Sequence, residues 1–172
     1  MAEAEFLPLG CVVMTVSDSR TPETDKSGDL VAQRLTDAGH RLIERRIVVD
    51  DRAELEAAFR EWVAHPEVEA VISTGGTGLT GRDVTPEAAA TVITKAIPGF
   101  GELFRWLSYE EIGPSTIQSR VQGGLAGTTL IFNLPGSSGA CRLAMDAIIV
   151  PQLDLRTRPC NFAEMMPRFD ES

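Results

Sequence analysis

Three glycines lie within four residues in the stretch Ser-Thr-Gly-Gly-Thr-Gly at 73–78. Glycine allows the backbone to approach an anion closely and to turn successive N–H groups toward it, and two threonines add hydroxyl groups. This combination is typical of a phosphate-binding loop. The plain alternative is a tight turn without a ligand, because glycine also favours turns at strand ends. The candidate binding residues are Ser73, Thr74, Gly75, Gly76, Thr77 and Gly78.

Two better-known nucleotide-binding patterns fit this stretch poorly. Residues 76–81 match Gly-x-Gly-x-x-Gly, but the third glycine of that pattern should lie in the helix that follows. Here Arg82-Asp83-Val84-Thr85 separates Gly81 from Pro86, where a helix is expected to begin. The phosphate loop of nucleoside triphosphatases needs Gly-Lys followed by Ser or Thr, whereas this chain has Gly81-Arg82-Asp83. A dinucleotide-dependent oxidoreductase is therefore a disfavoured alternative.

Two carboxylates, Asp50 and Asp83, are placed to complete an anion site. Asp83 follows the glycine-rich stretch closely, and Asp50 ends an apolar run. A carboxylate opposes a bound phosphate unless a divalent cation lies between them, and Mg²⁺ commonly takes one or two protein carboxylates plus substrate phosphates. We expect Asp83 to bind such a cation, with Asp50 as a second metal ligand or an orienting group. Asp50 could instead belong to a turn or helix cap, although Asp51 and Glu54 have the spacing of a capping box.

Other polar residues adjoin these groups. Thr85, Pro86 and Glu87 suit the cap, first position and first turn of a helix, respectively. Arg120, after Ser119, could offer a planar donor fork to a phosphate or an acidic ligand. Residues 133–138 read Asn-Leu-Pro-Gly-Ser-Ser, and their polar groups could bind a ligand or form a turn with Ser138 as the cap. The further candidates for substrate or nucleotide binding are Ser17, Asp18, Thr85, Pro86, Glu87, Ser119, Arg120, Asn133, Pro135, Gly136 and Ser137.

The elements that position these residues follow from hydrophobic patterning. Apolar, β-branched runs predict four strands, and helical spacing predicts five helices between and after them. This order predicts an α/β fold: a single three-layer domain whose doubly wound, mostly parallel sheet has helices on both faces. We expect an N-terminal extension (1–9), the α/β domain (10–150) and an extended C-terminal arm (151–172). The strands are expected at 10–17, 41–49, 70–74 and 128–134, and the helices near 30–38, 55–63, 86–96, 101–111 and 142–150.

Ligands of such sheets bind beyond the carboxyl ends of the strands. Four expected strands end in polar segments, which begin at Ser17, Asp50, Ser73 and Asn133. Because these ends lie at one edge of a parallel sheet, the segments should converge on a common site. The convergence is stronger evidence for a binding site than any one of the motifs.

Composition narrows the choice of partner. The 172 residues are 43% hydrophobic and carry a formal charge of −9, which argues for a folded core and against a broad basic surface for nucleic acid. The sequence contains no run of 18 consecutive apolar residues and therefore predicts no membrane-spanning segment. We expect a cytoplasmic protein. The three cysteines suggest neither a disulfide framework nor a zinc finger, and the two histidines occupy ordinary element boundaries.

Taken together, the motifs resemble the MogA/MoaB family of molybdenum cofactor biosynthesis proteins. The resemblance covers residues 10–162, and 104–113 and 156–162 resemble the MoaB branch in particular. Some MoaB-type proteins lack the Asp and Thr of Asp-Val-Thr-Pro, but both are present here, as Asp83 and Thr85. The resemblance rests on Thr-Val-Ser-Asp (15–18), Ser-Thr-Gly-Gly-Thr-Gly (73–78), Asp-Val-Thr-Pro-Glu-Ala (83–88), Pro-Gly-Phe-Gly-Glu (98–102), Ser119-Arg120 and Asn-Leu-Pro-Gly-Ser (133–137).

The resemblance implies a molybdopterin-binding fold and an Mg²⁺-dependent transfer of AMP from ATP to the terminal phosphate of molybdopterin. Asp50 and Asp83 match the family's two important acidic positions, so the resemblance implies that both are catalytic residues that place Mg²⁺ and the ATP phosphates. The loop at 74–78 and Ser119, Asn133, Pro135 and Gly136 match positions that line the pterin and nucleotide site. The resemblance also implies a homotrimer or a hexamer, and a molybdenum-insertion protein as a partner. A protein that binds or delivers molybdopterin without catalysis is the alternative.

Overall fold

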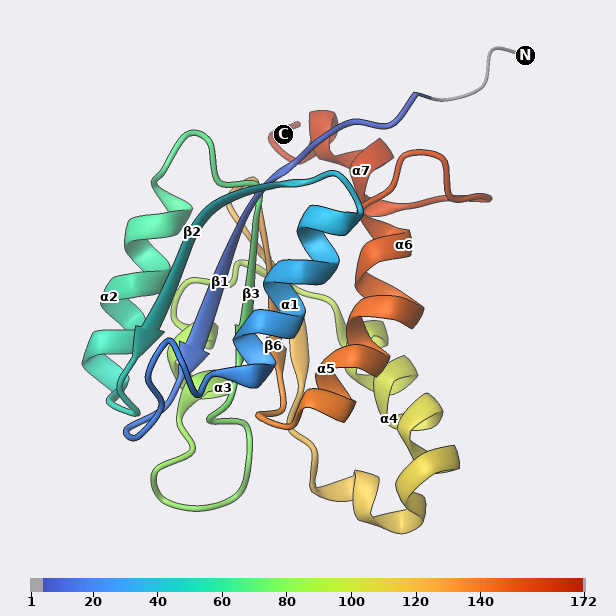
Figure 1. Cartoon of the computed structure of the whole chain (residues 1–172). Helices are drawn as coiled ribbons and strands as arrows, with labels where there is room; N and C mark the ends of the chain where they lie inside the picture. Colours follow the sequence, from blue (N-terminus) through green and yellow to red (C-terminus); the bar gives the residue numbers. More distant parts are fainter. Residues whose placement is uncertain (1–4, 172) are drawn as a thin grey trace.

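A computed structural model describes residues 5–171, which form a six-stranded sheet between two layers of helices (Figure 1). The strand order is β2-β1-β3-β6-β5-β4. The strands are β1 (Gly10–Val16), β2 (Arg41–Val48), β3 (Ala70–Thr74), β4 (Lys95–Ala96), β5 (Gln122–Ala126) and β6 (Thr129–Leu134). The principal helices are α1 (Lys26–Asp37), α2 (Arg52–Val63), α3 (Thr85–Ala90), α4 (Pro98–Ile112) and α5 (Ser138–Ala144).

The parallel part of the sheet confirms the expected α/β fold. β1 pairs with β2 and β3, and β3 pairs with β6, all in parallel. Every residue of β1, β3 and β6 is buried, as their continuous apolar sequences predict. β2 forms one edge of the sheet and is correspondingly less buried. The first and second predicted helices are α1, which ends before Gly39 with a φ of 95°, and α2.

The other edge of the sheet differs from the prediction. The helix expected at 86–96 ends at Ala90 as α3, and the chain then forms the short strand β4. β4 pairs antiparallel with β5, which pairs antiparallel with β6. β5 escaped prediction because its sequence, Gln-Gly-Gly-Leu-Ala, has little strand propensity. Its glycines are required sterically, since a Cβ atom at Gly124 would lie 2.5 Å from the Ile93 side chain.

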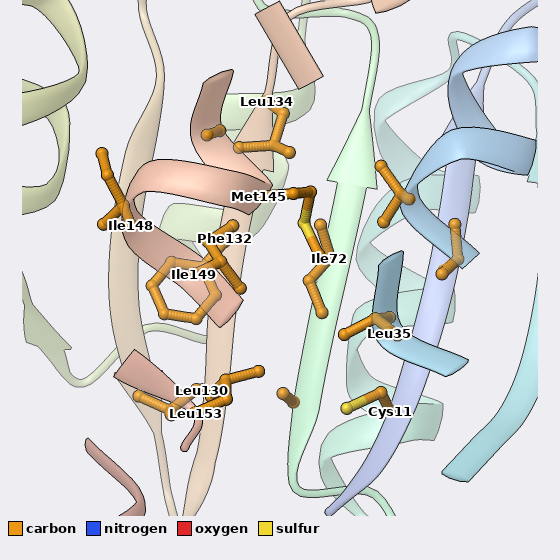
Figure 2. Close-up of a cluster of buried hydrophobic side chains, with 14 of the residues drawn as sticks. Cys11, Leu35, Ile72, Leu130, Phe132, Leu134, Met145, Ile148, Ile149 and Leu153 are labelled. Atoms are coloured by element: carbon orange, nitrogen blue, oxygen red, sulfur yellow. The ribbon is translucent and has the colours of Figure 1, made fainter. Parts of the chain in front are cut away.

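Helices cover both faces of the sheet, as a three-layer domain requires. α1, α4 and α5 cover one face, and α2 and α3 cover the other. Figure 2 shows the first core, where Ile72 and Phe132 of the sheet lie beside Met145 and Ile149. Phe132 also packs against Phe100 of α4, with ring centroids 5.0 Å apart and ring planes tilted by 54°.

The C-terminal region is more helical than predicted. The helix expected at 142–150 begins earlier, as α5, because Ser137 rather than Ser138 caps it: the Ser137 hydroxyl accepts a hydrogen bond from the Ala140 amide. It continues through the π-helical turn η2 (Met145–Ile149) into α6 (Val150–Gln152). Instead of a wholly extended arm after 151, α7 (Phe162–Met165) and η3 (Met166–Arg168) pack on the core.

Parts of two expected regions, residues 1–4 and 172, lie outside the described residues. Among residues 5–171, no helix is both long enough and apolar enough to span a membrane. α7 lies at the end of the sheet that is opposite the carboxyl ends of β1 and β2 (Figure 1). It is therefore remote from the candidate site, which we expect at those carboxyl ends.

Candidate functional site

The carboxyl ends of the four parallel strands lie side by side and bring the predicted segments together. The backbone amide of Ser17 donates to Val48 at 2.9 Å, and that of Gly75 donates to Leu134 at 3.0 Å. The amide of Thr85 donates to Gly76 at 3.0 Å, so the start of α3 joins the same cluster. Topology therefore creates a site from segments that are far apart in the sequence.

The glycine loop at 75–78 has a backbone that only glycine adopts easily at two positions. Gly75 and Gly76 have φ angles of 101° and 66°. A Cβ atom at Gly75 would lie 2.4 Å from the Val16 carbonyl oxygen, and one at Gly76 would lie 2.2 Å from Thr85 Oγ1. The glycines thus permit both an unusual conformation and close contact between strand ends.

Several predicted binding residues form hydrogen bonds in the strand ends next to the glycine loop. The Thr74 hydroxyl donates to the Pro135 carbonyl at 2.8 Å, and Asn133 Nδ2 donates to Ser73 Oγ at 2.9 Å. The side chains of Ser73, Thr74 and Asn133 are buried, as is Thr77. In this structure the polar side-chain atoms of Ser73, Thr74 and Asn133 bind other protein groups, and the binding of a ligand by these residues stays a prediction.

Thr85 also has a different role from the predicted helix cap. Val84 occupies the cap position of α3 and provides no side-chain hydrogen bond. Thr85 Oγ1 instead donates to the Gly75 carbonyl at 3.0 Å. Thr85 therefore ties α3 to the glycine loop, while Pro86 and Glu87 lie in the first turn as predicted.

The two predicted catalytic carboxylates flank the glycine loop. A Cβ atom at Gly76 would lie 2.9 Å from Asp50 Oδ1, and one at Gly78 would lie 2.7 Å from Asp83 Oδ2. The structure thus brings Asp50, from the segment after β2, to the glycine loop and Asp83, which both belong to the segment between β3 and α3.

The environments of Asp50 and Asp83 shift the pKa values of their carboxyl groups in opposite directions. Asp83 Oδ2 accepts hydrogen bonds from Thr80 Oγ1 at 2.6 Å and from the Thr80 amide at 2.8 Å. The hydrogen bond from the Thr80 side chain is the main cause that lowers the pKa of Asp83. Burial raises the pKa of Asp50, and the charges of Asp18 and Asp83 raise it further. Asp83 is therefore the better stabilised anion of the two.

Ser17 and Asp18 organise the first strand end. Ser17 Oγ accepts hydrogen bonds from the amides of Ser19 and Arg20 at 3.2 and 3.0 Å. Asp18 Oδ1 accepts from the Asp50 amide at 3.0 Å, and its other oxygen pairs with Arg82. The hydrogen bond with Arg82 lowers the pKa of Asp18. Asp18 thus fixes the backbone of Asp50.

Arg120 connects the glycine loop with α3 and is not a free fork for a ligand. Its Nε donates to the Gly78 carbonyl at 2.8 Å, and Nη2 donates to the Asp83 carbonyl at 2.8 Å. Its Nη1 donates to Glu87. Each guanidinium nitrogen thus binds a protein oxygen, and a contact of Arg120 with a ligand stays a prediction.

Gln122, at the start of β5, escaped sequence analysis. Its Nε2 donates to the Pro86 carbonyl at 2.9 Å and to Asn133 Oδ1 at 3.2 Å. A second such residue is Cys141, whose buried thiol contacts Thr74 Oγ1 and the Pro135 carbonyl, each at 3.2 Å. Burial raises the pKa of Cys141 to about 11, so the thiol is protonated at neutral pH. The one signal in the sequence for Gln122 was a polar residue directly before the glycine pair Gly123-Gly124.

Unpartnered buried atoms concentrate at this site. Within residues 5–171, four buried side-chain polar atoms have no hydrogen-bond partner, and three of them are Asp50 Oδ1, Glu87 Oε2 and Ser119 Oγ. Such atoms are rare and often mark functional positions. The described residues contain no cluster of three or more His, Cys, Asp or Glu side chains suited to a metal ion. A cation bound by Asp50 and Asp83 would need its remaining ligands from substrate or water.

Gly136 and Ser137 complete the surroundings of the loop. A Cβ atom at Gly136 would lie 3.6 Å from the Gly75 Cα atom, so the two loops are in contact. Ser137 caps α5, as described above, which accounts for its side chain without a ligand.

Comparison with known proteins agrees with this arrangement. The family model described as a probable molybdopterin binding domain matches residues 12–155. Molybdenum cofactor biosynthesis protein B of Escherichia coli K12 is 48% identical over 158 residues, which are 92% of this chain and 93% of that protein. The Bacillus subtilis protein of the same name is 46% identical over 144 residues, 83% and 85% of the respective chains.

Solved structures give the same result. A crystal structure of molybdenum cofactor biosynthesis protein B has a TM-score of 0.87 and 40% identity, and the match covers all of both chains. The tungsten cofactor synthesizing protein MoaB from Pyrococcus furiosus has a TM-score of 0.73 and 35% identity over 82% of this chain and 90% of that one.

Proposed function

This chain belongs to the molybdopterin-binding family of molybdenum cofactor biosynthesis proteins, and from that premise we propose that it adenylylates molybdopterin with Mg-ATP in the cytoplasm. An oxygen of the terminal phosphate of molybdopterin would attack the α-phosphorus of ATP. The bond from the α-phosphorus to the bridging oxygen would break, and pyrophosphate would leave. No protein nucleophile is needed, which suits a site whose one cysteine is buried and protonated.

The observation that carries the proposal is the position of Asp50 and Asp83 on either side of the glycine loop. Their carboxylates approach Gly76 and Gly78, respectively. Within residues 5–171, the amides of Gly76 and Thr77 donate no hydrogen bond to another residue, and Gly76 is only half-buried, so its amide is available to a phosphate. Anion donors between two acidic groups suit a phosphoryl substrate that arrives with a cation.

The residues fit Mg²⁺. The buried Oδ1 of Asp50 has no hydrogen-bond donor, and the nearby charges of Asp18 and Asp83 raise the pKa of Asp50. A cation at these carboxylates would relieve this repulsion. When bound, Mg²⁺ would neutralise charge on the ATP phosphates, while the protein positions the two substrates for attack.

The direct test is incubation of the purified protein with molybdopterin, ATP and Mg²⁺, followed by measurement of adenylylated pterin and pyrophosphate. Asp83→Asn should keep the fold and lower turnover about a hundredfold, in the range seen when a group that stabilises transition-state charge is removed. Asp170→Asn removes an exposed carboxylate far along the chain and is the matched control. Molybdopterin binding without product in the native protein would contradict catalysis and support a binding or delivery protein.

We also propose that the chain assembles as a homotrimer or a hexamer and passes its product to a molybdenum-insertion protein. Large apolar side chains are exposed on α4 and on η1 (Gly113–Gln118), which favours an interface between chains. Light scattering should give three or six times the chain mass of 18.6 kDa. A monomer at working concentration would contradict this assembly. The exposed residues are Leu103, Trp106, Tyr109, Ile112 and Ile117.

A further inference from the structure

His40 lies in the turn between α1 and β2, at the end of the sheet opposite the candidate site (Figure 1). Its side chain is buried, with 5% of the residue exposed, and its Nδ1 accepts a hydrogen bond from the Leu9 amide at 3.2 Å. The neutral ring therefore carries its proton on Nε2. Within residues 5–171, this Nε2 is buried and has no hydrogen-bond partner, which is rare in native proteins. His40 is thus a buried titratable group that the proposed reaction does not use.

The His40 ring contacts the segment before β1, residues 5–9, and holds it against this turn. The Phe6 ring packs against the His40 ring, with centroids 5.1 Å apart. Phe6 also covers Gly39, where a Cβ atom would lie 2.8 Å from Phe6 Cε1. The Arg156 guanidinium, from the loop between α6 and α7, lies 5.0 Å from the centre of the Phe6 ring. The contacts that hold residues 5–9 therefore converge on His40 and Phe6.

Protonation of His40 would oppose these contacts. An imidazolium carries a proton on each nitrogen, so its Nδ1–H would face the Leu9 N–H instead of accepting from it. The proton on Nε2 would have no acceptor in its present position. Burial lowers the pKa of His40 because it disfavours the charged ring, and the charge of Asp154, a smaller effect, raises it. The protonated ring is therefore better accommodated in water than in this turn.

The charged groups on the elements around His40 bind other protein groups or are exposed to solvent. Asp154, whose charge reaches His40, pairs with Arg156 at 2.8 Å. Within residues 5–171, no charged side chain forms a hydrogen bond or an ion pair with the His40 ring, so none compensates directly for a proton there. These charged groups are Glu5 before β1, Asp37 at the end of α1, Arg41 in β2, and Asp154 and Arg156 after α6.

We propose that His40 is a pH-sensitive switch that holds residues 5–9 against the fold when its ring is neutral and releases them when its ring is protonated. His40 is remote from Asp50 and Asp83, so the switch would operate whether or not the protein is an adenylyltransferase. In the released state His40 is in water and titrates near its ordinary pKa of 6.5, whereas in the closed state it titrates at a lower pH. The closed state is therefore fully favoured above that value and loses its advantage as pH falls below it, by up to about tenfold for each pH unit.

The test measures hydrogen exchange of the Leu9 amide in the full chain between about pH 8 and about pH 5.5, relative to the intrinsic exchange rate at each pH. Protection in the native protein should stay constant down to about pH 6.5 and then fall by about three- to tenfold. His40→Asn retains an acceptor, because Asn Oδ1 can take the place of Nδ1, but it does not titrate, so its Leu9 protection should not depend on pH. His65→Asn is the matched control. His65 Nδ1 also accepts from a backbone amide, that of Glu67 at 3.2 Å, but His65 is exposed, so this variant should keep the native pH dependence.

A second measurement uses the native protein and does not depend on the folding of His40→Asn. The chain has only two histidines, so NMR can follow the titration of each ring, with His65→Asn to assign the signals. The His40 ring should titrate below pH 6.5. The proposal is overturned if His40 titrates at or above pH 6.5, because the imidazolium would then be stabilised in place by a group such as Asp154. It is also overturned if Leu9 protection is the same at both ends of the pH range, or if it falls equally in His40→Asn.

Discussion

The parallel and antiparallel parts of the sheet contribute to the site in different ways. β1, β2, β3 and β6 supply the residues that follow each strand, such as Asp50 and Gly75. β5 runs antiparallel to β6, so the beginning of β5 lies beside the carboxyl end of β6. Gln122, the first residue of β5, pairs there with Asn133. Arg120, just before β5, and Gln122, its first residue, therefore reach the site from the beginning of a strand. A search confined to the residues after strands misses such contributions.

The parallel and antiparallel parts of the sheet also have different roles. The parallel strand ends hold the carboxylates and the glycine loop, whereas the residues that begin β5 tie these groups to α3. The first part would carry the chemistry, and the second would hold it in place. Four sets of variants test this division, beginning with the junction of the two parts.

Phe132→Ala should have the largest effect on folding. The Phe132 side chain is fully buried on β6, between β3 and β5, and contacts Phe100 and Phe162. The change should lower the free energy of unfolding by about 3–5 kcal/mol, measured by urea denaturation. Leu79→Ala, at a position 71% exposed, should change it by less than about 0.5 kcal/mol. A biphasic transition in Phe132→Ala would show that the two parts unfold separately.

The two parts also differ in how much of them could be predicted from the sequence. β1, β3 and β6 are continuous apolar runs, so their type, their burial and the meeting of their ends were accessible. β5 contains Gly123 and Gly124, and β4 has only two residues, so pairing across space decides their structure. The same limit applies to the site. The position of Asp83 near the glycines was visible, but the direction of the Thr74, Thr85 and Arg120 side chains was not, because their partners are distant in sequence.

Gly76→Ala should have the next largest effect. Alanine at a φ of 66° is strained, and its Cβ would meet Thr85 Oγ1 and Asp50 Oδ1. We expect a loss of about 1–3 kcal/mol in stability. Adenylyl transfer, if the proposed reaction is correct, should fall about a hundredfold because the carboxylate moves. Gly81→Ala is the matched control, since nothing lies within 4 Å of its Cβ position. Equal effects at the two glycines would contradict the structural role assigned to Gly76.

Arg120→Lys tests the hydrogen bonds by which Arg120, just before β5, connects the glycine loop with α3. Lysine keeps the charge but cannot bind Gly78, Asp83 and Glu87 with a planar fork. Stability should fall by about 1–2 kcal/mol, while KM for ATP or molybdopterin should rise because the glycine loop is less well held. Arg60→Lys, at an exposed position of α2, should change neither quantity. A normal KM and normal stability in Arg120→Lys would show that the guanidinium connection is dispensable.

Asp50→Asn and Asp83→Asn should have the smallest effects on stability, and in opposite directions. The pKa of Asp50 is raised by burial and neighbouring charges, so its contribution to stability is present below the ordinary value of 3.8 and is lost as pH rises through the folded-state pKa. Asp50→Asn should therefore stabilise the protein at neutral pH, by at most about 1 kcal/mol after solvent screening. The advantage should shrink as pH falls toward 3.8.

The pKa of Asp83 is lowered, chiefly by its hydrogen bond from Thr80, so its contribution is present above 3.8 and is lost as pH falls through the folded-state pKa. Asp83→Asn should thus be less stable than the native protein at neutral pH, and the difference should disappear in acid. Thermal denaturation across this pH range measures both variants. Each removes one negative charge and serves as the control for the other, because a general effect of net charge would shift both in the same direction. Shifts of equal sign would therefore refute the opposite electrostatic environments assigned to the two carboxylates.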